Sequence, residues 1–195
     1  MTATSIPAHL ATVEDGIRRL RRDILLRNLQ PGLSAETIRT TLASVDLPSA
    51  PELEALYGWH DGTATPPGVK LGSIYLLPGY YLLSLEDAVA NYKAFVGDRR
   101  WTTGWLPVFA DGGGDFYVVD FTAPSPNPVR LFWIDEDEAP IEFGSITAML
   151  NTIGQGYERG VFVNDEHGYL EMDSLDFEKV AAELNPDIKW WTEDV

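Results

Sequence analysis

The chain of 195 residues contains no cysteine, only three histidines and no long apolar run. Without cysteine there are no disulfide bonds and no thiolate nucleophile, which suits a reducing compartment. No stretch approaches the roughly 18 apolar residues that a membrane-spanning helix needs. The N-terminus lacks the basic start and apolar run of a secretory signal peptide. We therefore expect a cytoplasmic protein that does not contact membranes.

Basic residues are also scarce, since 14 Lys and Arg oppose 30 Asp and Glu, for a net charge of −16. Residues 1–39 carry six Arg and four acidic residues, whereas residues 40–195 carry eight basic and twenty-six acidic ones. Such a body repels nucleic acid, whose binding depends on neutralising phosphates. It attracts and steers a basic protein partner. The alternative is that the charge serves solubility or reflects an acidic proteome.

The motifs of common catalytic and nucleotide-binding sites are missing as well. There is no GxSxG elbow, no Walker loop and no GxGxxG after a strand. Two polar clusters, His60-Asp61 and Asp165-Glu166-His167, offer acid and base groups, but roles within turns are favoured because no further element completes a mechanism. We expect no enzyme activity, no cofactor and no metal.

The most informative segment is WTTGWLPVFADGGGDFYVVDF at 101–121. An apolar run at 105–110 and a second one at 116–121 flank three glycines, which tolerate positive φ and close backbone approach. The glycines are Gly112, Gly113 and Gly114, and Asp111 and Asp115 bracket them. We predict two antiparallel strands joined by a glycine turn whose amides bond to the carboxylates. A calcium loop is disfavoured because the EF-hand pattern is absent.

Apolar periodicity predicts the remaining elements. Apolar residues recur at helical spacing from Leu10 to Leu29 and predict a first helix. The solvated face of this helix is formed by Arg18, Arg19, Arg21 and Arg22. Ser49 and Glu52 resemble a capping box that opens a short helix ending at Gly58. Gly154, Gly156 and Gly160 are expected to loosen the chain after the helix at 145–153. Further helices are predicted over 34–44, 84–96 and 174–184, strands over 71–77, 80–83, 129–134 and 140–143, and a hairpin over 161–173.

The order of these elements predicts the α+β class: one domain with a mostly antiparallel central sheet and helices packed on one side. We divide the chain into an N-terminal helix at 1–33, an α+β core at 34–160 and a hairpin-and-helix appendage of the same domain at 161–195. Ile188 to Trp191 forms a tail, and the Trp190-Trp191 pair docks either on its own domain or on another chain.

Two ordered motifs resemble the SUKH superfamily, the Smi/Knr-like group. LPSAPELEALYGWHDG at 47–62 is similar to the family's opening motif of Leu-Pro, short helix, aromatic residue and His-Asn/Asp-Gly. WLPVFADGGGDFYVVDF at 105–121 is similar to its strand, glycine-rich turn and Asp-ending strand. Pro128-Val129 and the helix after Phe143-Gly144 also fit, so the resemblance covers about 35–155. The departures are Ala50-Pro51, where the family more often has a polar and an aromatic residue, and Asp61, where Asn is frequent.

The resemblance implies a six-stranded or similar sheet with helices packed on it, and a groove that binds a partner protein. Bacterial members are often immunity proteins that neutralise a secreted toxin inside the cell. Fungal members are regulatory and scaffolding proteins of cell-wall synthesis. On this basis we expect an immunity protein that binds a basic toxin and occludes its active surface. The alternatives are a regulatory protein of the same fold and, less favoured, an enzyme or small-ligand binder that uses His60.

Aromatic residues near an acidic rim are the best candidates for the partner surface, because Trp is enriched in interface hot spots. Trp59 and Trp101 fall in predicted loops, although Trp101 can equally close the end of the core. The acidic run Asp135-Glu136-Asp137-Glu138 is either a solvated loop or a contact for the basic partner. The predicted partner-binding residues are Trp59, His60, Asp61, Trp101, Asp111, Asp115, Asp135, Glu136 and Asp137.

Overall fold

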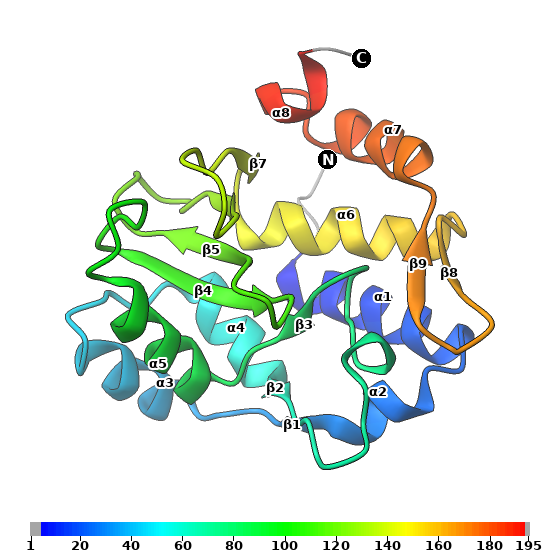
Figure 1. Cartoon of the computed structure of the whole chain (residues 1–195), viewed down its shortest axis with the longest axis horizontal. Coiled ribbons are helices and arrows are strands. Elements are labelled where there is room, and N and C mark those ends of the chain that lie inside the picture. The colour runs from blue at the N-terminus through cyan, green and yellow to red at the C-terminus, as the bar shows by residue number, and fades with distance from the viewer. Residues whose placement is uncertain (1–4, 194–195) are drawn as a thin grey trace.

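The computed structural model describes residues 5–193 and has the α+β architecture (Figure 1). Helices lead, antiparallel strands fill the middle, and helices follow, which confirms the predicted class. The elements are α1 (Ile6–Arg19), α2 (Asp23–Asn28), β1 (Leu29–Pro31), α3 (Ala35–Ala43), α4 (Pro51–Trp59), β2 (His60–Thr63), the 3₁₀ turn η1 (Leu71–Ser73), β3 (Tyr81–Leu82), α5 (Leu85–Phe95), β4 (Trp105–Ala110), β5 (Phe116–Asp120), β6 (Val129–Phe132), β7 (Ile141–Phe143), α6 (Ile146–Glu158), β8 (Phe162–Asn164), β9 (Leu170–Met172), α7 (Ser174–Leu184) and α8 (Lys189–Thr192).

The main sheet is an antiparallel meander of five strands in the order β3-β4-β5-β6-β7. Strands β4 and β5 flank the glycine turn, with Ala110 opposite Phe116, so the predicted strand–turn–strand unit is confirmed. The family resemblance implies a six-stranded or similar sheet, and this sheet has five strands. Strands β1 and β2 pair separately, as do β8 and β9, which confirms the hairpin predicted over 161–173.

Both faces of the main sheet are covered, because every residue of β4 and β5 is buried. On one face Phe95 of α5 packs with Trp101, Phe116 and Phe132 at ring-centroid distances of 5.2 to 5.7 Å. Elsewhere on the sheet, Phe143 of β7 contacts Trp191 of α8 at 5.8 Å. The main sheet therefore has side chains packed on both faces, in addition to the layer of helices on one side that the sequence predicts.

Helices α1 and α6 lie against each other, and small residues allow their close approach (Figure 1). A Cβ atom on Gly16 would lie 2.4 Å from Cβ of Tyr157, and one on Gly154 would lie 3.1 Å from Thr12. Gly156 faces Phe162 in the same way. The expectation that the glycines loosen the chain is wrong for Gly154 and Gly156, because α6 continues through both to Glu158 and uses them for packing.

The helix predicted from Leu10 to Leu29 is broken in two at Arg21, which adopts a φ of 54°. The break turns the Arg22 side chain inward, where only 4% of the residue is exposed. Its guanidinium donates to the carbonyls of Gly72, Tyr75 and Gly168 and to Oδ1 of Asn164 at 3.0 to 3.3 Å. The placement of Arg22 on a solvated face was therefore wrong, since four oxygen acceptors compensate for burial of the cation.

Two further local predictions are wrong. The strand expected over 71–77 is the 3₁₀ turn η1 followed by irregular chain, and within it Gly72 lies tightly against the ring of Tyr169. The capping box at Ser49 does not form, since α4 begins at Pro51 with no side-chain cap. Glu52 instead accepts a hydrogen bond from the amide of Ile146 at 3.1 Å and so caps α6.

Substituting Gly16 by Ala tests the α1–α6 contact. The new methyl group would overlap the Tyr157 side chain, and we expect the free energy of unfolding to fall by about 1–3 kcal/mol. Chemical denaturation measures the change. Gly97→Ala is the matched control, because nothing lies within 4 Å of its Cβ position, and it should change stability by less than about 0.5 kcal/mol. Equal effects of the two substitutions would contradict the packing account.

Candidate partner-binding surface

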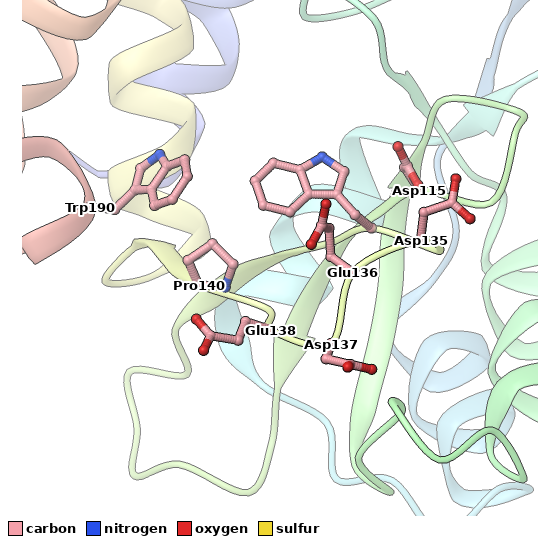
Figure 2. Close-up of a pocket in the computed structure, with 8 residues that line it drawn as sticks. Asp115, Asp135, Glu136, Asp137, Glu138, Pro140 and Trp190 are labelled. Atoms are coloured by element: carbon pink, nitrogen blue, oxygen red, sulfur yellow. The ribbon is translucent and has the colours of Figure 1, made fainter.

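The acidic run at 135–138 and one carboxylate of the glycine turn surround an open hollow of about 760 Å³. Figure 2 shows Trp190 and Pro140 on one side of this hollow and Asp115 and Asp135 on the other. We call it the acidic–aromatic hollow. It is lined by Asp115, Trp133, Asp135, Glu136, Asp137, Glu138, Pro140 and Trp190.

Backbone contacts hold the acidic rim in place. Oδ1 of Asp115 accepts a hydrogen bond from the amide of Ile134 at 2.9 Å, which ties the glycine turn to the segment after β6. The four acidic residues 135–138 are all exposed. Arg99 lies 2.9 Å from Asp137, but both side chains are at least 70% exposed, so the ion pair contributes little to stability. The rim therefore presents a concentrated negative charge to solvent.

Two indoles form the aromatic part of the hollow. The ring centroids of Trp133 and Trp190 are 5.8 Å apart and their planes are inclined by 55°. Trp190 is 44% exposed, whereas its neighbour Trp191 is 7% exposed and donates a hydrogen bond from Nε1 to the carbonyl of Glu142. Consecutive residues of a helix point in different directions, so docking Trp191 turns Trp190 outward. The tail therefore docks on its own domain.

A second hollow of about 780 Å³ adjoins the first and shares Pro140 and Trp190 with it. Ile141 of β7 and Ile188 before α8 supply its apolar wall, and Arg130 and Lys189 lie at its edge. Trp190 thus stands between an acidic hollow and a more apolar one. The sequence left open whether the Trp190-Trp191 pair contacts another chain, and the predicted partner-binding residues did not include Trp190. Its signal was the Trp-Trp pair in an amphipathic tail, where one ring packs and the other stays exposed.

A buried carboxyl group lies on β7, the strand that Trp191 packs against. Glu142 is 3% exposed, and Tyr117 donates a hydrogen bond to its Oε2 at 2.9 Å. Burial raises the pKa of Glu142 from its ordinary value to about 7, and the Tyr117 hydrogen bond opposes this shift only in part. Burial thus extends the range in which Glu142 stays protonated from about pH 4.5 to about pH 7 in the folded protein.

Asp111 belongs to the turn rather than to the hollow. Its Oδ1 accepts hydrogen bonds from the amides of Gly113, Gly114 and Asp115 at 2.7, 3.0 and 2.9 Å. Gly112 and Gly114 adopt φ angles of 89° and 118°, which explains the need for glycine. The predicted hydrogen-bonded glycine turn is confirmed for Asp111.

Trp101 was predicted as an exposed loop residue or as the end of the core, and the structure supports the core position. Only 6% of it is exposed, and it packs against Phe95, Trp105 and Phe132. Its exposure at a partner surface is therefore the wrong alternative. The indole of Trp101 contributes a large apolar area to this cluster, and its Nε1 has no hydrogen-bond partner there.

Trp59, His60 and Asp61 lie apart from the lining of both hollows, and each bonds to a structural partner. Trp59 ends α4 rather than lying in a loop, and donates to Oε2 of Glu14 at 3.1 Å. Nδ1 of His60 lies 2.8 Å from the carbonyl of Gln30, and Oδ1 of Asp61 accepts from the amide of Leu85 at 2.8 Å. The last contact caps α5, so His60 and Asp61 bond to different parts of the fold.

The second polar cluster also forms a turn. Oδ1 of Asp165 accepts hydrogen bonds from the amides of His167 and Tyr169 at 2.8 and 2.7 Å. Among residues 5–193 no group of three His, Cys, Asp or Glu side chains is arranged to hold a metal ion. Within the same range no helix combines the length and apolarity needed to cross a membrane.

Comparison of the chain with models of protein families and with curated proteins finds no match. The resemblance to the SUKH superfamily therefore remains a prediction from the two motifs.

Glu142→Gln tests the buried carboxyl group. Because the folded pKa lies above the ordinary value near 4.5, its stabilising contribution is complete below about pH 4.5 and is lost as the pH rises to about 7. Between these two pH values we expect the free energy of unfolding of the wild type to fall by roughly 3 kcal/mol relative to that of the variant. Urea unfolding across pH measures it. Parallel curves for wild type and variant would contradict the prediction, and the exposed Glu178→Gln should give such parallel curves.

Asp111→Ala tests the glycine turn. Three amides lose their acceptor, and because the site is half-exposed we expect a loss of about 1–2 kcal/mol in the free energy of unfolding. Asp135→Ala, at an exposed carboxylate of the same region, should be close to neutral. A neutral Asp111→Ala would show that the carboxylate does not hold the turn.

Proposed function

We propose that this chain is a non-catalytic protein-binding domain whose partner is a basic protein, and that it acts as an immunity protein against a toxin. The observation that carries the proposal is the acidic–aromatic hollow. It brings five carboxylates and two indoles to one open surface, and these are the groups that recognise Lys and Arg side chains.

The electrostatics favour a basic partner at two ranges. At long range the net charge of −16 accelerates association with a positively charged surface. At contact, Asp135, Glu136 and Glu138 are exposed and have no ion-pair partner among the described residues, so they can pair with incoming cations. Both effects weaken as salt is added.

The aromatic side of the surface supplies apolar contact area. Trp190 is 44% exposed and is carried by the helix α8, which limits the conformational entropy lost on binding. Trp133 lies beside it, and the adjoining hollow extends the surface along Pro140 and Ile141. An exposed, rigid tryptophan within an acidic rim has the composition of an interface hot spot.

The immunity role itself rests on the SUKH resemblance, which relates this fold to toxin neutralisation. In that role the domain would cover the active surface of the toxin and leave its chemistry unchanged. A regulatory protein of the same fold would use the same kind of surface with an endogenous partner, so the test must separate binding from rescue.

The test is co-expression with the protein encoded beside this gene, in a host that this neighbour alone poisons. We expect growth to be rescued and a complex to co-purify. Trp190→Ala combined with Glu136→Gln and Glu138→Gln should weaken the complex by about tenfold or more. The control combines Glu171→Gln and Glu178→Gln, which removes equal charge from β9 and α7 and should leave binding unchanged.

A complex without rescue would favour regulation over immunity. Equal weakening by the control would show that net charge, rather than the hollow, determines binding. Absence of both rescue and complex would contradict the immunity proposal.

A further inference from the structure

A third hollow, of about 680 Å³, lies where α2, the loop before η1 and the β8–β9 turn meet. These segments are far apart in sequence, and the buried Arg22 joins them. Its guanidinium bonds to Gly72 and Tyr75 on one side and to Gly168 and Asn164 on the other. Arg22 therefore holds together the segments that form the walls of this hollow.

The hollow is positively charged although the chain is strongly acidic. Its lining contains Arg27, Lys70 and His167. None of the described residues that line it is Asp or Glu. A carboxylate outside the lining, Glu166, lies 3.7 Å from Nε2 of His167. The charge of the hollow thus rests mainly on Arg27 and Lys70.

These two cations belong to the six Lys and Arg residues without a carboxylate partner among residues 5–193, and both line the same hollow. Eight of the 14 Lys and Arg residues form ion pairs with Asp or Glu. Arg27 has no hydrogen bond or ion pair of its side chain in the described structure, and Lys70 only lies over the ring of Tyr169 at 5.9 Å. With 30 acidic residues in the chain, two unpaired cations at one hollow leave room for an external anion.

The remaining lining residues define what accompanies the anion. Ile24, which is 40% exposed, and Val69 form an apolar wall, and Ser73 places a hydroxyl group in the lining. A guanidinium and an ammonium group together match the charge of a phosphate monoester, which is −1.5 to −2 at neutral pH. An apolar or ring-shaped part of the same molecule would lie against Ile24 and Val69.

We propose that this basic hollow binds a small phosphorylated molecule, with Arg27 and Lys70 contacting the phosphate group and Ile24 and Val69 contacting an adjoining apolar part. The site is separate from the acidic–aromatic hollow and does not depend on the immunity role. Figure 1 places α2 and the chain leading into β7 on opposite sides of the molecule, so both ligands can bind at once.

The experiment is an NMR titration of the full chain with phenyl phosphate, followed at the Tyr169 ring and the Ser73 amide. Phenol serves as an uncharged probe, and benzoate serves as a probe with a single carboxylate. We expect saturable binding of phenyl phosphate, about tenfold or more tighter than of either other probe, because only the phosphate carries enough negative charge to match both Arg27 and Lys70.

The double variant Arg27→Gln/Lys70→Gln should weaken phenyl phosphate binding by about tenfold or more. Lys93→Gln is the matched control, since Lys93 also lacks an ion pair but lines a different hollow, between α3 and α5. Both altered side chains of the double variant are exposed, so its thermal midpoint should match that of the wild type. If the double variant does not fold, Lys70→Gln alone provides the comparison.

Equal affinity of wild type and variant for phenyl phosphate would overturn the proposal. So would equal binding of benzoate, which would identify a general carboxylate site, or shifts that miss Tyr169 and Ser73.

Discussion

The docking of Trp191 against the last strand of the sheet is the contact on which the proposed partner surface depends. The indole packs between Phe143 and Phe177 and donates its N–H to the backbone of Glu142. This contact fixes α8, and α8 presents Trp190 to the hollow. Without it, the acidic run would still carry charge, but the aromatic wall would be lost. A tail at the end of the chain thus completes a surface built by β6 and β7.

Exposed charges of opposite sign lie on opposite sides of the molecule, so the two sides favour ligands of opposite charge. The connection between β6 and β7 exposes four carboxylates, and the region around α2 exposes Arg27 and Lys70 without acidic partners. Arg22, a third cation of the same region, is buried and holds the wall of the basic hollow together. The net charge of the chain reflects the acidic side and gives no indication of the basic hollow.

The sequence predicted the elements that depend on local signals. The glycine turn, its two strands and the helix over 84–96 follow from alternation, glycine and helical periodicity, and all are present. Long-range contacts could not be predicted in this way. Glu52 caps a helix that starts 94 residues later, and Arg22 faces inward because of carbonyls contributed by distant loops. At the site, the acidic run was identified, whereas Trp190 required knowledge of where Trp191 docks.

Fluorine NMR of the protein labelled with fluorotryptophan tests the central claim most directly, because the chain has only six tryptophans. Each signal can be assigned by a Trp→Phe substitution, and the proposed partner, the protein encoded by the neighbouring gene, is then added. The account predicts that the signals of Trp133 and Trp190 move, while those of Trp59 and the buried Trp101 and Trp105 stay. Movement of Trp59 with Trp133 and Trp190 unchanged would place the interface elsewhere and contradict the account.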